Sequence, residues 1–199
     1  FLWNHPKIKD RQIIFNSITQ AFTLKTKLAA SSAELLGRPP PPMQAISIAK
    51  AFLSVMSLLP KDIDDTKTRT TFLKLNGTRL VGATSLSESD YIQIDFYRKP
   101  ISDLPIMNPH QNQALLSFRI KMTERESYKH IVEAHYAYKE IDSSLNPSTY
   151  PIKTAQDAFN DLRLGKAYVV SQTFLQGPIR IERLYLAYYE GDDEVQFLL

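Results

Sequence analysis

A helix signal followed by a strand signal, within residues 150–190, constrains the fold of this chain more than any other feature. Thr154 can cap a helix with its hydroxyl, and Asp157, three residues later, suits the first turn. Apolar residues follow at the i, i+3, i+4, i+7 spacing of one buried helix face: Ala155, Ala158, Phe159 and Leu162. Gly165 comes where a left-handed C-cap is least costly. The sequence therefore predicts a short amphipathic helix.

A hairpin is predicted after this helix. Residues 179–190 alternate as a strand does, and both of its faces become apolar towards the end, which is typical of a strand covered on both sides. Residues 167–171 supply the first strand of the hairpin, and Gly177-Pro178 breaks the chain between the two. Such a unit cannot bury its apolar faces alone. We therefore expect Phe159 and Leu162 to be buried between their helix and a sheet that includes residues 179–190.

The first 38 residues are predicted to form a helical or extended segment. Asp10 can cap a helix, and Gly37 can end it. The apolar residues at helical spacing between them are Ile14, Ile18, Ala21, Phe22, Leu28, Ala33, Leu35 and Leu36. The β-branched residues between positions 13 and 26 leave a strand open as the alternative. Pro39 to Pro42 then form a stiff spacer.

Residues 43–142 are predicted to form a first helix-plus-sheet unit. A helix from Met43 to Ser57 has one apolar face and ends before Pro60. Asn76-Gly77 lies between two strand-like runs and predicts a type I′ hairpin, in which both turn residues have positive φ. Alternation of apolar and polar residues predicts further strands within 91–98, 116–122 and 128–141.

Together these elements predict an α+β fold in which antiparallel sheets carry helices on one face. The predicted divisions of the chain are 1–38, 43–142 and 143–199, the last being a second helix-plus-hairpin unit, and one continuous domain is the alternative. Short amphipathic helices at 45–53 and 155–162 both precede strand-rich stretches. Two similar helix-plus-sheet units are therefore a variant of the same prediction.

Composition limits the class of protein. Hydrophobic residues make up 43% of the chain, which suits a globular core. The net charge is only +3 and no run of Lys and Arg strengthens it, so nucleic acid is not an expected partner. There is no cysteine, which excludes disulfides and thiolate metal sites.

No apolar run approaches the roughly 18 residues that a membrane helix needs. The opening residues Phe1, Leu2 and Trp3 nevertheless suit the end of a membrane anchor, because aromatic residues gather at membrane interfaces. An anchor that precedes residue 1 is therefore expected, and an ordinary apolar terminus is the alternative.

No residue pattern predicts a metal, a cofactor or a catalytic nucleophile. The histidines are His5, His110, His130 and His135, and they lack the spacing of metal ligands. Three aspartates could attract calcium, but they lack the glycine and the distal glutamate of a calcium loop: Asp62, Asp64 and Asp65. We therefore expect a solvated turn there and no cofactor in the protein.

Tyrosines are the candidate binding residues. Tyrosine combines a large contact area with a polar tip, which suits the recognition of a peptide or a glycan. The residues that could line a sheet face are Tyr136, Tyr138, Tyr185 and Tyr189. The alternative is that these tyrosines lie at the rim of the core with solvated hydroxyls.

The stretch from 150 to 190 resembles the PepSY-like domains of extracytoplasmic bacterial proteins and the membrane-anchored regulators of cell-wall sensor kinases. The resemblance covers about a fifth of the chain, and its motif carries no catalytic residue. The matching residues are Tyr150, Pro151, Ile152, Thr154, Ala158, Leu162, Gly165, Ile179, Ile181, Leu184, Leu186, Ala187, Tyr188 and Tyr189. It implies a protein tethered outside the cytoplasmic membrane that acts by binding.

The function predicted from the sequence is a non-enzymatic, extracytoplasmic binding or regulatory module, anchored by a segment before residue 1. Its expected partner is a protein or a cell-wall polymer. One alternative is a cell-envelope hydrolase, whose acid and base would come from Asp90, Asp95, Glu124 and Glu126. Another is a subunit of a larger surface assembly, because the chain ends in the apolar run from Val195 to Leu199.

Overall fold

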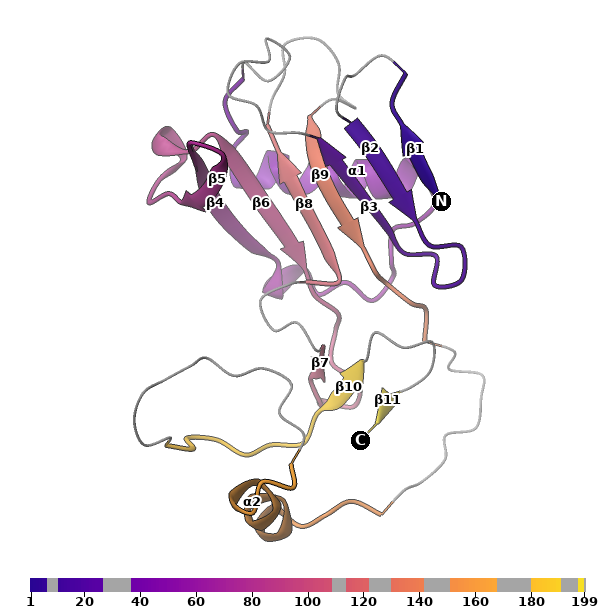
Figure 1. Cartoon of the computed structure of the whole chain (residues 1–199), viewed down its shortest axis with the longest axis vertical. Helices are drawn as coiled ribbons and strands as arrows, with labels where there is room; N and C mark the ends of the chain where they lie inside the picture. Colours follow the sequence, from indigo (N-terminus) through magenta and orange to yellow (C-terminus); the bar gives the residue numbers. More distant parts are fainter. Residues whose placement is uncertain are drawn as a thin grey trace. The chain divides into compact units, whose positions relative to one another are not determined.

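The computed structural model describes residues 1–6, 11–26, 37–108, 114–121, 130–141, 151–167, 180–190 and 197–198. The chain divides into two compact units (Figure 1). Unit 1 consists of Phe1–Arg98 and Gln113–Glu140, and unit 2 consists of Lys99–Asn112 and Ile141–Leu199. The units are interleaved, because the chain leaves unit 1 after β6 and returns to it at β8, whereas the divisions predicted from the sequence were at residues 38 and 143.

Unit 1 contains an eight-stranded antiparallel sheet. The order of its strands is β1-β2-β3-β9-β8-β6-β4-β5, so the N-terminal strands pair with β9 from much later in the chain. The strands are β1 (Leu2–Asn4), β2 (Arg11–Phe15), β3 (Phe22–Thr26), β4 (Arg69–Asn76), β5 (Arg79–Gly82), β6 (Tyr91–Phe96), β8 (Leu116–Ile120) and β9 (Ile131–Tyr136). The predicted α+β fold with an antiparallel sheet is confirmed.

The helix α1 (Pro42–Val55) packs on one face of this sheet and lies behind it in Figure 1. Its proline start is favourable, because the first helical turn leaves N–H groups unpaired in any case. Ala45, Ala49 and Leu53, spaced by four, are fully buried against the sheet. From the sheet, alternate residues of β6 and β8 complete the core, and the ring of Phe118 meets that of Phe52 edge-on at 6.0 Å. The predicted helix at 43–57 is confirmed.

Of the helical and extended alternatives predicted for the first 38 residues, the structure shows the extended one where it describes them. Residues 11–26 form β2 and β3, which pair in antiparallel register from Arg11↔Thr26 to Phe15↔Phe22. The spacing of Ile14, Ile18 and Phe22 suits both a helix and a hairpin with a turn at 16–20. Pairing of β3 with β9 settles the choice for the strand. Leu28 and the residues up to Leu36 lie outside the described residues.

Two local features of the sheet differ from simple alternation. The hairpin β4–β5 is confirmed, but its turn residues are Gly77 and Thr78, and only Gly77 has positive φ (+63°), as in a type II′ turn rather than type I′. Between β8 and β9 the register shifts, because Arg119 pairs with Glu133 whereas Ile120 pairs with Ile131. Val132 is therefore the extra residue of a β-bulge.

Short 3-10 helices connect the strands of unit 1. They are η2 (Asp65–Lys67) and η3 (Leu86–Glu88). Asp64 caps the first of them by accepting a hydrogen bond from the Thr66 backbone N–H at 3.0 Å. This hydrogen bond and the Thr66 hydroxyl lower the pKa of the Asp64 carboxyl, the hydroxyl being the larger cause.

Unit 2 contains the helix α2 (Ala155–Arg163) and a three-stranded sheet in the order β11-β10-β7. Its strands are β7 (Ile106–Met107), β10 (Tyr188–Glu190) and β11 (Phe197–Leu198), with β10 and β7 parallel. The described part of unit 2 therefore does not repeat unit 1. No helix in the described ranges of the chain is long and apolar enough to cross a membrane.

The N-cap and the stop of α2 are confirmed. The Thr154 hydroxyl accepts a hydrogen bond from the Asp157 N–H at 3.1 Å, and Gly165 has positive φ (+68°). The predicted burial of this helix is wrong, because α2 has no buried residue, Phe159 is half-buried and Leu162 is 41% exposed.

The strand predicted after α2 is also too long. Of residues 180–190, only Tyr188–Glu190 form a strand, and the apolar side chains of Ile181, Leu184 and Leu186 are exposed. The first strand of the predicted hairpin and the Gly177-Pro178 break lie outside the described residues, apart from Ala167.

Candidate functional site

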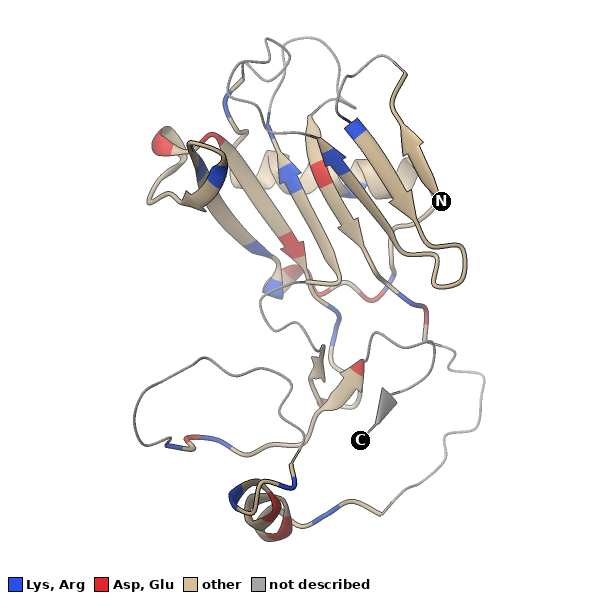
Figure 2. Cartoon of the chain, in the orientation of Figure 1, with Lys and Arg blue, Asp and Glu red and all other residues tan. Residues whose placement is uncertain are grey.

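The face of the large sheet opposite α1 carries two cross-strand rows of polar side chains, which we call the polar face. The register places one residue from each of seven strands in the first row: Thr71, Gln93, Arg119, Glu133, Lys25, Gln12 and Asn4. The second row contains Arg69, Asp95, Ser117, His135 and Thr23. In β3, β4, β6, β8 and β9 their neighbours along the strand point into the core below α1, so these side chains point away from it. Figure 2 shows basic and acidic positions alternating over β8, β9 and β3.

Asp95 is the most buried charged group of the polar face, with 0% exposure. Its carboxylate accepts hydrogen bonds from Arg69 Nη2 at 2.9 Å, from Gln93 Nε2 at 3.0 Å and from Ser117 Oγ at 2.7 Å. Arg69 keeps 45% of its side chain exposed, and its hydrogen bond to Asp95 raises the pKa of the guanidinium. The acid is therefore fully satisfied beneath the surface while the base faces outwards.

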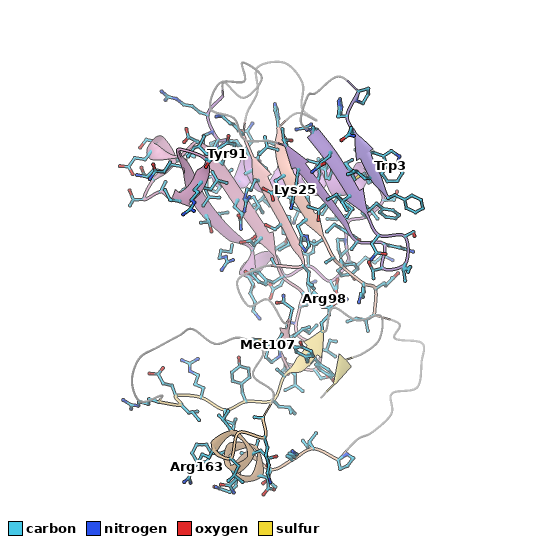
Figure 3. All side chains as sticks on the ribbon, in the orientation of Figure 1. Trp3, Lys25, Tyr91, Arg98, Met107 and Arg163 are labelled. Carbon is cyan, nitrogen blue, oxygen red and sulfur yellow. The ribbon has the colours of Figure 1, made fainter. Side chains whose placement is uncertain are left out.

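Arg119 continues this network along the first row. Its Nε donates to Gln93 Oε1 at 3.1 Å, and its Nη1 pairs with Glu133 on β9. Lys25 on β3 is the cross-strand partner of Glu133 on β9, and it is exposed. Figure 3 labels Lys25 near the middle of the sheet. The exposed charged groups of the polar face are therefore mainly basic.

Two weaker contacts lie at the ends of the polar face, a long hydrogen-bond contact and a cation–π contact. His135 Nδ1 lies 3.4 Å from the Thr23 hydroxyl. At the other end of β8, the Lys121 ammonium lies 4.8 Å from the centre of the Tyr91 ring. Burial lowers the pKa of Lys121, although the charge of Asp90 opposes the change, and burial raises the pKa of Tyr91.

A second polar cluster lies where β6 and β9 end. Arg98, only 8% exposed, pairs through Nε with Asp62 Oδ2 at 2.7 Å, and its guanidinium carbon lies 4.4 Å from the centre of the Tyr138 ring. The Tyr138 hydroxyl donates to Asp62 Oδ1 at 2.8 Å. Burial, followed by this hydrogen bond, raises the pKa of Tyr138 far above its ordinary value. The cluster joins the loop before η2 to the ends of two strands.

The four predicted tyrosines are divided between the two units. Tyr136 and Tyr138 lie in unit 1 with ring centroids 6.4 Å apart, whereas Tyr185 and Tyr189 belong to unit 2. Tyr136 is only 6% exposed and stacks on Phe22 at 5.2 Å, so it is part of the core. Tyr138 packs against that core and holds Asp62, which matches the core-rim alternative.

In unit 2 the two tyrosines differ from each other. Tyr185 is 60% exposed, and its hydroxyl contacts Met107 Sδ at 3.9 Å. Tyr189 is half-buried in β10, between Met107 and Leu198 in the register. Tyr185 therefore stays a candidate contact residue, and no neighbour identifies a ligand for it.

The acidic residues of the hydrolase alternative do not converge where they are described. Asp95 is bound by its three donors, and Asp90 Oδ2 accepts the Leu75 backbone N–H at 2.8 Å. Glu124 and Glu126 lie outside the described residues, so that part of the prediction stays untested. The two described acids act as structural acceptors in these contacts.

The three aspartates before β4 each have a separate partner. Asp62 pairs with Arg98, Asp64 accepts from Thr66, and Asp65 pairs with Lys50 at 2.6 Å. Within the described ranges no three histidines and acids lie close enough together to hold a metal ion.

Two of the histidines lie on β9 or next to it. The β-bulge brings His130 opposite Lys121, as their backbone hydrogen bond shows, and His135 lies opposite Ser117. Four residues along β8 separate these positions, or about 13 Å. His130 and His135 therefore do not share a metal ion, and His110 lies outside the described residues.

Polar side chains from seven strands of unit 1 therefore lie in one row on the polar face. Its acids are bonded to arginine, amide and hydroxyl donors. Of the hydroxyls in its rows, that of Ser117 donates to the Asp95 carboxylate at 2.7 Å, and that of Thr23 lies 3.4 Å from His135 Nδ1. No protein-family model matches the chain, and comparisons with curated proteins and with solved structures find no similar protein.

Proposed function

We propose that this chain is a non-enzymatic binding or regulatory module that works outside the cytoplasm, tethered at the membrane, and that the polar face of unit 1 is its binding surface. The observation that carries the proposal is the pair of polar rows, one across seven strands and one across five. Charged residues in such rows are linked to one another by hydrogen bonds, which fixes them in place and reduces the entropy that binding would cost.

The character of the partner follows from the exposed charges. Lys25 and Arg69 are exposed, whereas Asp95 is buried and Glu133 keeps only 27% of its side chain exposed. A partner that presents carboxylates or phosphates therefore complements this surface. A protein or a cell-wall polymer with such groups fits, and nucleic acid fits less well because the two rows contain no aromatic side chain on which bases could stack.

The proposed location rests on the stretch around α2 that resembles PepSY-like domains. The chain has no cysteine, which is compatible with an oxidising compartment because no thiol requires protection. No residue described in unit 1 favours the hydrolase over this proposal.

Site-specific photocrosslinking tests the binding surface. A photoreactive amino acid would replace Lys25 on the polar face. In a second variant it would replace Lys74 on β4, which is exposed on the other face of the sheet, because Leu73 and Leu75 on either side of it point to the side of the polar face. Irradiation with isolated cell envelopes should give a discrete adduct from position 25 and none from position 74. Equal labelling from both positions, or no adduct at position 25, would overturn the proposal.

A further inference from the structure

Aliphatic and aromatic side chains are exposed together where β1 and the β2–β3 turn form one corner of unit 1. We call this the hairpin corner; it consists of the exposed Leu2, Trp3, Ile13, Ile14 and Ile18 and the half-buried Phe15. Ile18 is 73% exposed, Leu2 60% and Trp3 54%. The rings of Trp3 and Phe15 lie 6.4 Å apart, so the aromatic residues form one cluster. Figure 3 labels Trp3 at the outer edge of the sheet.

No side chain of the hairpin corner is charged, and the α-ammonium of Phe1 donates to the Phe15 carbonyl at 2.7 Å. Residues 1–6 and 12–24 contain no lysine, arginine, aspartate or glutamate, although such residues make up 23% of the chain. In Figure 2 the strand β1 and the β2–β3 turn are accordingly tan. The nearest charged residues of the hairpin, Arg11 and Lys25, lie at the end of the ladder away from the turn. Four residues separate Arg11 from Phe15, so the hairpin changes from charged to apolar over about 13 Å.

Both faces of this edge are apolar. In the register, Trp3 pairs with Ile13 on the α1 side of the sheet, and Leu2 pairs with Ile14 on the side of the polar face. A flat protein partner would cover one face of the edge, whereas a lipid interface surrounds both faces. β1 is an edge strand of the sheet, so the backbone N–H and C=O groups on its outer side require hydrogen-bonding partners. The headgroup region of a bilayer supplies such partners, and the hydrocarbon core does not.

We propose that the hairpin corner inserts into the headgroup region of a lipid bilayer. Tryptophan is favoured at this depth, because its amphipathic ring gains apolar contact there without losing water entirely, and aliphatic side chains and phenylalanine gain contact with the acyl chains beneath. Arg11 and Lys25 then lie towards the aqueous side. The inference rests on the proposed location at a membrane, but it concerns a peripheral contact that this chain makes through its own sheet edge.

The single tryptophan makes the proposal measurable, because Trp3 is the only one in the chain. Its emission would be recorded as vesicles of phosphatidylcholine and phosphatidylglycerol are added to the 199-residue chain, and the bound fraction would be measured by flotation. The emission should shift to the blue and the protein should float with the vesicles. Ile18→Asp, which adds a charge at the turn, should weaken binding about tenfold or more, because an inserted isoleucine is replaced by a charged group.

Met43→Asp is the matched control. Met43 is 75% exposed, close to the 73% of Ile18, and lies in the first turn of α1, where an acid is favourable. It should bind vesicles as the unchanged chain does. Leu2→Asp on β1 serves as a second corner variant. If a thermal melt shows that Ile18→Asp is misfolded, vesicle binding by Leu2→Asp is compared with that of the Met43→Asp control instead.

Three outcomes would overturn the inference: no blue shift with vesicles, equal binding by the corner variants and the Met43 control, or a blue shift without lipid that grows with protein concentration. The last would mean that a second copy covers the corner. Failure of the crosslink from position 25 with intact vesicle binding would instead overturn the proposed binding surface and leave the hairpin corner standing.

Discussion

The buried carboxylate of Asp95 depends on three donors from β4, β6 and β8. Asp95→Ala leaves these donors without their acceptor, and hydrogen bonds to a charged group are each worth about 1.5–3 kcal/mol. Because the three contributions are not additive, we expect the free energy of unfolding to fall by about 3–5 kcal/mol, the range for removing one partner of a buried ion pair, measured by urea melts. Asp65→Ala removes an ion pair whose carboxylate is 69% exposed and should hardly move the midpoint. Similar losses in the two variants would contradict this account.

Tyr138 gives a prediction for alkaline pH. Its pKa is raised above the ordinary value of 10.0, so the folded protein holds the phenol proton to higher pH than the unfolded chain does. The resulting stabilisation is complete below about pH 10 and is lost as the pH rises above it. Tyr138→Phe keeps the ring beside Arg98 but removes the hydroxyl that Asp62 accepts from. The variant should be less stable at pH 8, and urea melts at pH 11 should show a smaller difference. A constant difference would be the contrary result.

Gly77 adopts the positive φ that the β4–β5 turn requires and that other residues adopt only with strain. Its φ is +63°, and a Cβ at this position would meet no atom within 4 Å, so the cost of Gly77→Ala is conformational. We expect a loss of about 1–2 kcal/mol in thermal or urea unfolding. Gly82→Ala, on β5 with equal space and no positive φ, should leave the protein unchanged or slightly more stable. If both substitutions behave alike, the turn is not of the type described.

At the scale of the element, α1 shows how one face of a helix stabilises the sheet. Leu53 is fully buried and Val55, two residues later, is 87% exposed. Leu53→Ala should lower the free energy of unfolding by about 2–5 kcal/mol, through lost apolar burial and the cavity left behind. Val55→Ala should change it by less than about 0.5 kcal/mol. Urea melts of the two variants decide whether α1 packs through this face.

Elements with a strong local signal could be predicted from the sequence. The period of Ala45, Ala49 and Leu53 predicted α1, and the alternation of β6 and β8 predicted two central strands whose core residues are now seen to be buried. The N-cap at Thr154 was equally clear, because the hydrogen bond that defines it is made within three residues.

Elements that depend on distant partners could not be predicted in this way. The strand β3 forms because Leu24 packs opposite Ala134, more than a hundred residues away, and its own spacing also suited a helix. The strand β10 is short because only Tyr188 and Tyr189 find a partner in β7. Apolar periodicity alone predicted burial for Leu162, but no described element covers it.

At the scale of the whole molecule, the polar face exists only because of strand order. Lys25, Glu133 and Arg119 are neighbours because β3, β9 and β8 are adjacent in the sheet. The sequence showed that Arg119 alternates with apolar residues and so faces outwards. It gave no means of knowing which polar residues stand beside it, since register and a β-bulge decide that. Residue type alone suggested the tyrosines as binding residues. Tyr136 lies in the core because it is two residues from the buried Ala134 on β9, so the two side chains point to the same face of the sheet.

We expect unit 1 to fold without unit 2. The chain leaves unit 1 after Arg98 and returns at Gln113, yet Phe96 and Leu116 are paired neighbours across β6 and β8. A turn of about four glycine- and serine-rich residues can therefore join these ends as an ordinary hairpin loop. A protein made of residues 1–98, this turn and residues 113–140 retains all eight strands and α1. It should unfold in urea in one cooperative transition.

Leu53→Ala supplies the control for this shortened protein, because it removes a core side chain that belongs wholly to unit 1. The substitution should lower the urea midpoint in the shortened protein by about as much as in the full chain, since sites without shared partners have additive effects. A broad, non-cooperative transition, or a Leu53→Ala variant that melts like its parent, would show that the sheet and α1 need unit 2 to fold.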